Sequence, residues 1–264
     1  MKKAIIIIVW VFLIGGAAFL FTFINREHKS MKCTKIDINI NSNGQSDFIT
    51  KKDIEQILTL NDVSVNKKYI TEINNEKIEK KILENAFVSS ADAYTTNDGC
   101  LKVNVKQRRP LVRVINNRGE SFYLDDESYM MPLSSKYTPR IIIAHGNITN
   151  NYSAGFKLIN YPKKVRIDTN KLTDLQKVYV FCKYIDKSDF WKAMTEDVYV
   201  ESNGDMVLYL TLGTQPVILG GADNLGEKLG KLKEFYQQKM SKLGWNKYKS
   251  INLKYKNQVV CSKN

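Results

Sequence analysis

Alternating apolar and polar positions mark short strands along the chain, and apolar positions at helical spacing mark helices. Ile36, Ile38 and Ile40 alternate with polar residues, which is the period of a half-buried strand. Thr50 then suits a helix N-cap, with an acid three residues later at Asp53. The first folded segment is therefore predicted to be a strand followed by a helix.

Three more elements complete a first folded unit. A second helix is predicted from near Asn75, a strand over Val88 to Tyr94, and a returning strand over Leu101 to Val105. The turn signal Asn97-Asp98-Gly99 joins the two strands in a hairpin. The order strand, helix, helix, strand, strand predicts an α+β layer in which two helices cover one face of a small sheet.

The remainder of the chain is predicted to be a mixed β unit with two helices. The helices span about Asn170 to Ile185 and about Asp223 to Leu243, with Phe190-Trp191 packed in a short helix or loop between them. Short strands are predicted at residues 111–115, 122–125, 131–133, 141–143, 198–200, 206–212 and 217–219. The chain then ends in a hairpin whose turn lies at Lys256-Asn257.

A membrane segment is predicted near the start of the chain. The run from Ala4 to Ile24 contains no charged residue and is long enough to cross a bilayer as a helix. A cleaved signal peptide is the alternative, because Gly15-Gly16-Ala17-Ala18 offers small residues for cleavage, but the apolar run continues beyond it. We therefore expect a cytoplasmic tail at residues 1–3, a transmembrane helix at 4–25 and a linker at 26–32. The positive charges on the two sides of the predicted transmembrane helix nearly balance. The short N-terminal tail favours an orientation with the N-terminus in the cytoplasm and most of the chain outside it.

The formal net charge is +13, which is compatible with a solvated surface and also with an anionic neighbour such as a membrane surface, a cell-wall polymer, a nucleic acid or an acidic protein. The lysines are scattered, and no basic run is interleaved with aromatics to follow a phosphate backbone. We therefore expect no nucleic-acid partner. The four cysteines contain no Cys-x-x-Cys pair; in an exported chain they permit disulfides without requiring them, and buried free thiols are equally compatible. They are Cys33, Cys100, Cys182 and Cys261.

The sequence contains no recognisable catalytic set. Its histidines, His28 and His145, are too few and too far apart for a zinc site, and no Gly-x-Ser-x-Gly elbow is present. Gly221 and Gly226 have the spacing of a phosphate loop, but the required Gly-Lys-Ser/Thr is missing. The acids Asp125-Asp126-Glu127 lack the spacing of a calcium loop. We expect no enzyme activity, cofactor, metal or small-molecule substrate.

The order of elements just after a membrane segment resembles a POTRA domain. Phe48-Ile49-Thr50 before the first helix and Gln107-Arg108-Arg109-Pro110 after the last strand resemble the FtsQ/DivIB family of cell-division proteins. In the second unit, Phe122 to Asp126 and the tail Ile251 to Tyr255 resemble the β domain of that family. On physical grounds alone the Gln107 to Pro110 segment is equally a plain domain junction, because a proline disfavours helix in the residue before it.

The resemblance implies a POTRA-like domain at residues 33–109 and an FtsQ-type β domain at residues 110–264. It also implies a non-enzymatic, single-pass divisome scaffold of the inner membrane, with its bulk in the periplasm at the division septum. The expected partners are FtsB- and FtsL-like membrane proteins, with other division proteins engaged through the POTRA domain. Such a scaffold would help to coordinate septal peptidoglycan synthesis.

Two strand edges are the candidate partner sites. A terminal hairpin leaves an edge strand with unpaired backbone groups, onto which a partner segment adds as a further strand. The expected contact residues, placed after the C-terminal site of the family, are Lys254, Tyr255, Gln258, Val259 and Val260. Lys254 is expected to complement acidic charge on the partner. A second edge, in the POTRA-like unit, would present Val88, Ala91 and Tyr94.

Two other functions are compatible with the sequence. One is a POTRA-bearing transport or assembly factor that handles unfolded envelope clients at the edge of its small sheet. The other is a membrane anchor that binds cell-wall polymer through its positive charge, and high salt would weaken such binding.

Overall fold

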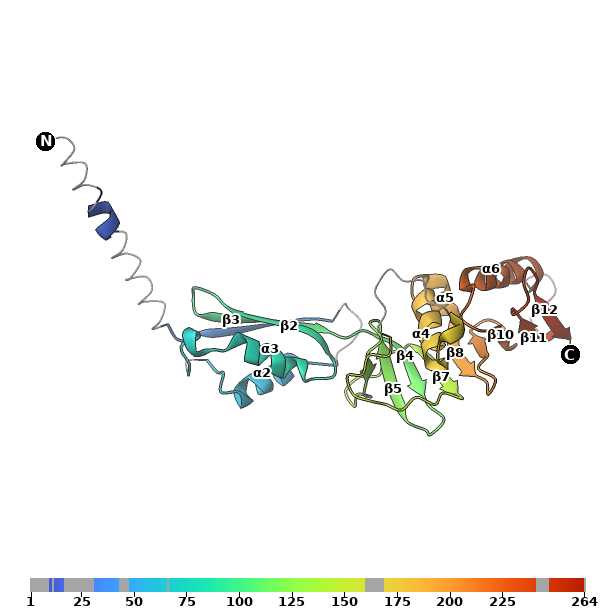
Figure 1. Cartoon of the computed structure of the whole chain (residues 1–264), viewed down its shortest axis with the longest axis horizontal. Coiled ribbons are helices and arrows are strands. Elements are labelled where there is room, and N and C mark those ends of the chain that lie inside the picture. The colour runs from blue at the N-terminus through green and yellow to red at the C-terminus, as the bar shows by residue number, and fades with distance from the viewer. Residues whose placement is uncertain are drawn as a thin grey trace. The chain divides into compact units, whose positions relative to one another are not determined.

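The computed structural model of the 264-residue chain describes Trp10 and residues 12–16, 31–42, 48–65, 67–159, 169–240 and 247–263. The chain divides into two compact units, Met1–Gln107 and Arg108–Asn264 (Figure 1). The boundary expected from the sequence, after Arg109, lies two residues further along the chain.

The predicted membrane helix lies mostly outside the described residues. Its described part, Trp10 and residues 12–16, is helical, and the Trp10, Phe12 and Leu13 side chains are exposed. Within the described ranges, no helix has both the length and the apolar character needed to cross a bilayer.

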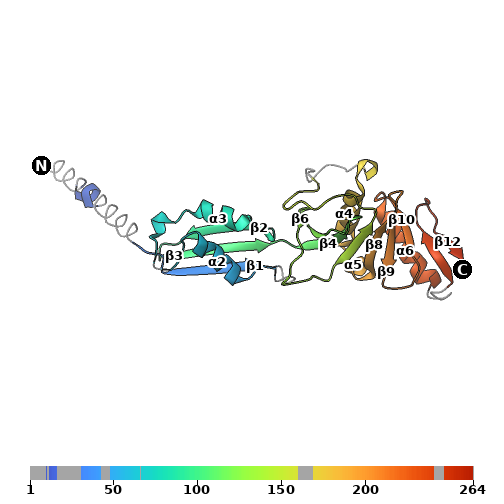
Figure 2. The same ribbon diagram turned by 90° about the horizontal axis from the view of Figure 1, so that it is seen from below.

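The first unit is a three-stranded sheet with two helices on one face (Figures 1 and 2). The strand order is β1-β3-β2, with β1 parallel and β2 antiparallel to the central β3. The elements in chain order are β1 (Lys35–Asn41), α2 (Lys51–Leu60), a 3₁₀ turn η1 (Ile70–Glu72), α3 (Asn75–Leu83), β2 (Val88–Thr95) and β3 (Cys100–Gln107). This order confirms the strand, helix, helix, strand, strand prediction.

Local capping and strand alternation account for this unit. The Thr50 hydroxyl accepts a hydrogen bond from the Asp53 N–H, and the Asp53 carboxylate accepts one from the Thr50 N–H, which is the predicted start of α2. At the start of α3 the Asn74 side chain accepts a hydrogen bond from the Lys77 N–H at 2.9 Å. The buried helix residues Ile54 and Ile82 then lie over the buried face of β3. That face consists of Leu101, Val103 and Val105.

The second unit is a nine-stranded sheet in the order β12-β11-β10-β9-β8-β7-β4-β5-β6. Its strands are β4 (Pro110–Ile115), β5 (Ser121–Asp125), β6 (Met130–Met131), β7 (Ile142–Gly146), β8 (Thr195–Val200), β9 (Met206–Leu210), β10 (Val217–Gly220), β11 (Tyr248–Asn252) and β12 (Val260–Lys263). Its helices are η2 (Thr169–Lys171), α4 (Asp174–Ile185), α5 (Asp189–Met194), α6 (Leu225–Phe235) and a π turn η3 (Tyr236–Met240). Figure 1 shows α4, α5 and α6 together on one side of this sheet.

One apolar core joins the helices to the inner sheet face. Phe181 and Leu232 are fully buried against alternate strand residues such as Val198, Leu208 and Ile251. On the opposite face, those strands expose Tyr199 and Tyr209, among others. Burial of these inner side chains is the main stabilising contribution in this unit, because it removes their apolar surface from water.

Several elements differ in extent from the sequence expectation, and the helices illustrate this. The first long helix begins at Asp174 rather than near Asn170, because Thr173 and Gln176 form a capping box that starts it there. The helical segment of α6 passes into a π turn at Tyr236, and the predicted end at Leu243 lies outside the described residues. The segment around Trp191, expected as a short helix or a loop, is the short helix α5, so the unit has a third α-helix.

Candidate functional site

The last strand, β12, ends the nine-stranded sheet. It pairs antiparallel with β11, with Cys261 opposite Ile251 and Val260 opposite Asn252. No element of the described chain lies on its other side. The Val260 side chain is 40% exposed. An edge strand of this kind presents N–H and C=O groups that can pair with another chain.

The loop that leads into β12 is fixed to helix α6. Lys231 Nζ donates to the Tyr255 carbonyl at 2.8 Å, and the Asn257 N–H donates to Glu227 Oε1 at 3.4 Å. The hydrogen bond from Lys231 lowers the pKa of Glu227, so this carboxylate stays charged. Asn257 has a left-handed backbone with φ of 59°, which places the turn at the predicted position. Strand β12 therefore begins just after a turn that is hydrogen-bonded to helix α6.

The five residues predicted for this edge occupy four different environments. Val260 is the first residue of β12, and Val259 before it is partly buried against the core. Tyr255 and Gln258 lie in the exposed turn, with Tyr255 51% exposed. Lys254 is exposed, but its Nζ lies 2.6 Å from Asp205 Oδ2. That hydrogen bond raises the pKa of Lys254, so an acidic partner would compete with Asp205 for it.

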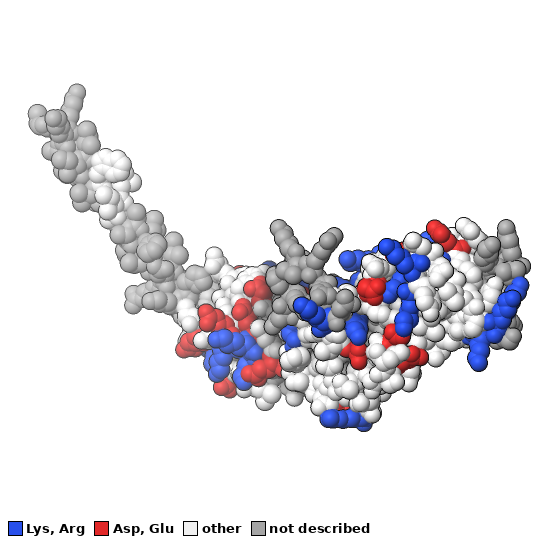
Figure 3. Space-filling view, turned by 45° about the vertical axis from the view of Figure 1, so that its right-hand side comes forward, with Lys and Arg blue, Asp and Glu red and all other residues white. Residues whose placement is uncertain are grey.

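Most of the net positive charge belongs to the second unit. Residues 31–107 contain 11 Lys and Arg and 11 Asp and Glu, whereas residues 108–264 contain 25 and 15. Sequence reasoning missed this asymmetry, although a count for each predicted domain would have found it. Exposed lysines lie in and beside the terminal hairpin, and Figure 3 shows Lys and Arg side chains at this end of the unit. They include Lys249, Lys256 and Lys263.

The free edge of β2 is partly closed. The Ala93 N–H donates to Glu79 Oε1 of α3 at 2.8 Å, so this amide points away from β3. Because amides alternate along an antiparallel strand, the Ala91 backbone also faces the open side and the Tyr94 backbone faces β3. Val88 is buried and precedes a bulge. Of the three predicted contact residues, Ala91 therefore presents its backbone, and Tyr94 presents only a side chain that is 41% exposed.

The other end of the nine-stranded sheet is covered by the chain itself. The Met130 N–H in β6 donates to the Phe156 carbonyl at 2.9 Å, and Tyr129 forms an isolated antiparallel bridge with Lys157. A segment of the same unit thus lies along β6. Of the two ends of this sheet, β12 is the one without a covering segment in the described ranges.

The Gln107-Arg108-Arg109-Pro110 segment carries out two structural tasks. Gln107 is buried, and its Oε1 accepts a hydrogen bond from the Ile49 N–H at 3.1 Å within the first unit. This bond fixes the Phe48-Ile49-Thr50 segment at the start of α2. Pro110 begins β4 in the second unit, so the proline opens a strand there.

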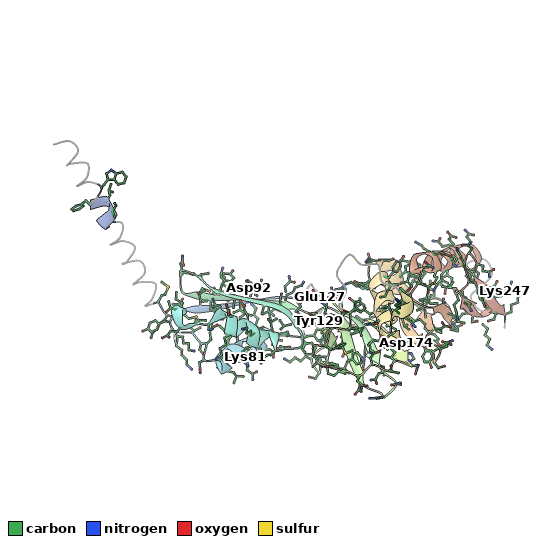
Figure 4. All side chains as sticks on the ribbon, in the orientation of Figure 1. Lys81, Asp92, Glu127, Tyr129, Asp174 and Lys247 are labelled. Atoms are coloured by element: carbon green, nitrogen blue, oxygen red, sulfur yellow. The ribbon has the colours of Figure 1, made fainter. Side chains whose placement is uncertain are left out.

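Arg108 and Arg109 form ion pairs within the second unit. Arg108 Nη1 lies 2.7 Å from Asp125 Oδ2, and its guanidinium lies over the ring of Tyr129, which is labelled in Figure 4. Arg109 reaches Asp186 at 2.7 Å and Asp126 at 3.2 Å. The hydrogen bond from Arg109 lowers the pKa of Asp186, whereas burial raises the pKa of Asp125 despite Arg108. Of the three acids compared above with a calcium loop, Asp125 and Asp126 therefore form ion pairs with arginine.

No catalytic constellation appears among the described residues. His145 Nε2 lies 2.8 Å from Asp197 Oδ2 on the exposed sheet face, and His28 lies outside the described ranges. A hollow of about 680 Å³ beside α4 and α5 includes Cys182 in its lining, and burial raises the pKa of this thiol, which keeps it protonated. No group of three or more His, Cys, Asp or Glu side chains suited to a metal occurs in the part of the chain that the structure describes.

Comparison with known proteins agrees with this architecture. A model of POTRA-like domains matches residues 31–106, which contain the small sheet and its two helices. A model described as FtsQ/DivIB, C-terminal related, matches residues 109–262, from the start of β4 into β12. No curated protein matches the chain. Because the second model covers more than half of the chain and the POTRA-like unit precedes it, this protein belongs to the FtsQ/DivIB family of cell-division proteins.

Proposed function

We propose that this protein is a non-catalytic, membrane-anchored scaffold of the divisome that binds FtsB- and FtsL-like partners outside the inner membrane. Family membership supports a role in cell division and interaction with other division proteins. In this proposal, binding at the septum helps to coordinate peptidoglycan synthesis. The observation that supports the binding mode best is the open edge of β12.

The proposed contact is addition of a partner strand to β12. Main-chain hydrogen bonds would supply affinity, and side chains on alternate residues, such as Val260 and Ser262, would supply selectivity. The lysines beside the hairpin would favour a partner segment rich in Asp or Glu and speed its association. Tyr255 and Gln258 would contact the partner from the turn, next to the strand.

Membrane anchoring is the second part of the proposal. The uncharged run from Ala4 to Ile24 supports a single crossing, with residues 1–3 in the cytoplasm and residues 26–264 in the periplasm. A reporter that is active only in the periplasm, fused after residue 264, is expected to give signal. A silent reporter on a stably expressed fusion would overturn this topology.

Substitution Val260→Asp tests the edge in the full-length, detergent-extracted protein. Val260 is 40% exposed, so the fold should tolerate the change, while a carboxylate on the free strand should oppose pairing with an acidic segment. Tyr209→Asp is the matched control, because Tyr209 is 42% exposed and lies on β9 inside the sheet. Circular dichroism and the melting temperature check that both variants are folded.

The readout is the amount of FtsB-like partner that co-purifies from membranes. We expect Val260→Asp to weaken partner binding at least about tenfold, or ~1.4 kcal/mol, and Tyr209→Asp to leave it within about twofold. Equal retention of the partner by both folded variants would refute binding at β12. Depletion of the protein is expected to produce filamentous cells, and normal septation after full depletion would contradict the division role.

The transport-factor alternative is less well supported by the geometry. It requires clients to add to β2, where Glu79 already accepts the hydrogen bond of the central outward amide, Ala93. The free edge of β12 needs no such displacement. The partner site is therefore assigned, within this proposal, to the second unit.

A further inference from the structure

The chain enters the first unit at one end of its sheet. The Cys33 N–H donates to the Lys68 carbonyl at 3.0 Å, and the Thr34 N–H donates to the Gly99 carbonyl at 2.9 Å. These bonds join the segment before β1 to the start of the 3₁₀ turn η1 and to the turn between β2 and β3. Residues 31–34, 67–70 and 96–99 therefore lie together, and we name them the entry end of the first unit.

Helix α2 leads toward the entry end. Its start is fixed at the opposite end of the unit, because the Ile49 N–H donates to the side chain of Gln107 at the end of β3. The loop after the helix then leads to Lys68, which is part of the entry end. Leu60, the last residue of α2, and Val65, in that loop, therefore lie on the side of the unit nearest the entry end.

Apolar side chains gather on this side of the unit without being buried. Leu60 is 76% exposed, and Val65 and Tyr69 are exposed as well. So is Tyr94, close to the turn between β2 and β3. Among the described residues of the unit, Leu83 is the one other large apolar side chain that is exposed, and it lies where α3 leads into β2, at the opposite end. A gathering of exposed apolar side chains marks an interaction surface.

The sequence places the membrane close to the entry end. Residues 25–30 are all that separate Met31 from the uncharged run that ends at Ile24. The seven Cα–Cα steps from residue 24 to residue 31 would span about 25 Å at most when fully extended. A tether of that length holds the entry end at a high effective concentration at the bilayer surface, so even a weak contact with lipid would be well populated.

The residue types at this end suit a lipid–water interface. Leu60 and Val65 are aliphatic and gain free energy on leaving water. Tyr69 combines an apolar ring with a polar hydroxyl, the kind of side chain that is enriched at the level of the lipid headgroups. The Lys32 Nζ lies 5.9 Å from the centre of the Tyr69 ring, so an ammonium group that suits a lipid phosphate lies beside it.

Net charge alone does not favour a membrane contact here. Lys67 and Lys68 are balanced by the acidic side chains of Asp62 and Asp98. The Thr96 hydroxyl donates a hydrogen bond to Asp98 that lowers the pKa of this exposed carboxylate, which therefore stays charged. The apolar side chains would then supply most of the affinity, and the contact should change little with salt.

We propose that the entry end docks on the periplasmic face of the membrane, with the side chains of Leu60 and Val65 inserted among the lipid headgroups. The inference rests on the membrane anchoring in the proposed function, and it adds a lipid contact made by the folded part of the chain. Docking would restrict the rotation of the first unit about its tether. The opposite end of the unit, with Leu83, would point away from the lipid.

The test is lipid quenching of a fluorophore on the full-length protein in nanodiscs of phosphatidylcholine and phosphatidylglycerol. The fluorophore NBD is attached to Leu60→Cys or to Val65→Cys, and Cys261→Ala removes the half-buried native thiol. The other native cysteines are buried, namely Cys33, Cys100 and Cys182. Leu83→Cys is the matched control, because Leu83 is also an exposed leucine that ends a helix, at the opposite end of the unit.

A second set of nanodiscs contains phosphatidylcholine with a nitroxide near the top of the acyl chain. We expect this lipid to lower the fluorescence of the labels at residues 60 and 65 at least about twofold, because an interfacial apolar side chain lies about 5–10 Å into the boundary between headgroups and acyl chains. The label at residue 83 should keep its fluorescence. High salt should leave the quenching at residues 60 and 65 in place.

Three results would overturn the docking: no quenching at residues 60 and 65, equal quenching at all three positions, or loss of the quenching in high salt. Each of them, in protein that co-elutes with the nanodiscs, would leave the anchoring intact. Protein that stays outside the nanodiscs would overturn the anchoring and the docking together. Partner binding at β12 is measured separately by co-purification, so its failure is distinguishable from both.

Discussion

Removal of the Arg109 guanidinium is expected to destabilise the second unit through a charge left without its partner. Arg109 binds Asp186 at 2.7 Å and Asp126 at 3.2 Å, just before the first strand of the unit. Asp186 is the C-cap of α4, so this contact joins the end of a core helix to the start of β4. The variant Arg109→Met keeps much of the side-chain volume and removes the charge.

The magnitude follows from burial. The side chains of Arg109, Asp186 and Asp126 are 20%, 15% and 32% exposed. Removing one partner of a buried ion pair costs about 3–5 kcal/mol, and an exposed pair contributes about 0–1 kcal/mol. Partial exposure, together with Lys192 at 3.6 Å from Asp186, places the expected loss near ~2 kcal/mol.

The loss is expected to depend on pH. Arg109 lowers the pKa of Asp186 below its unfolded value of about 4. The stabilisation is therefore fully present above the unfolded pKa and disappears as the pH falls through the folded pKa. The difference between wild type and Arg109→Met should be largest at neutral pH and shrink toward pH ~3. Urea denaturation, followed by the fluorescence of the buried Trp191, measures it at each pH.

Arg118→Met is the matched control in the same unit, since Arg118 donates to Asn151 at an exposed position. It should change the free energy of unfolding by less than about 0.5 kcal/mol. The reasoning fails if Arg109→Met costs no more than this control, or if its cost is the same at pH ~3 and at neutral pH.

Three further outcomes are expected. Thr50→Ala should lower the free energy of unfolding of the first unit by about 1 kcal/mol through loss of the capping box with Asp53, and chemical denaturation with Thr71→Ala as control measures it. Phe181→Ala should cost about 3–5 kcal/mol in the second unit, because the side chain is fully buried, and a cost below about 1 kcal/mol would contradict the core assignment. Glu79→Ala should speed amide hydrogen exchange at Ala93 while Glu79→Gln restores part of the protection; unchanged exchange in both would show that the carboxylate does not cover this amide.

Local sequence signals predicted most elements of the fold. The Thr50–Asp53 capping box and the alternation of Ile36, Ile38 and Ile40 need only neighbouring residues, and both appear in the structure. The capping box of Thr173 and Gln176 can also be recognised in the sequence, and it would have placed the start of α4 at Asp174 instead of near Asn170. Such signals are informative because they depend on contacts within one turn or one strand.

Contacts between distant segments limited what the sequence could predict about the sites. Nothing near Lys254 indicates that Asp205 forms an ion pair with it, or that Glu79 reaches the Ala93 amide from a helix. Both contacts follow from tertiary packing. The terminal hairpin itself was predictable. Strand β12, however, begins at Val260, whereas the sequence placed Gln258 and Val259 in the strand as well. The turn before it is bonded to helix α6, and the sequence does not indicate these contacts.

In the described chain β12 has one strand neighbour, β11, and in the proposed binding mode this would make the lifetime of the protein depend on the supply of its partner. A strand held from one side frays more readily than one held from both, so an unaccompanied copy exposes its last hairpin to proteolysis. Occupancy of the vacant side would add stability that grows with the logarithm of partner concentration. Surplus copies would then be degraded first, which would keep the amounts of scaffold and partner matched without a dedicated regulator.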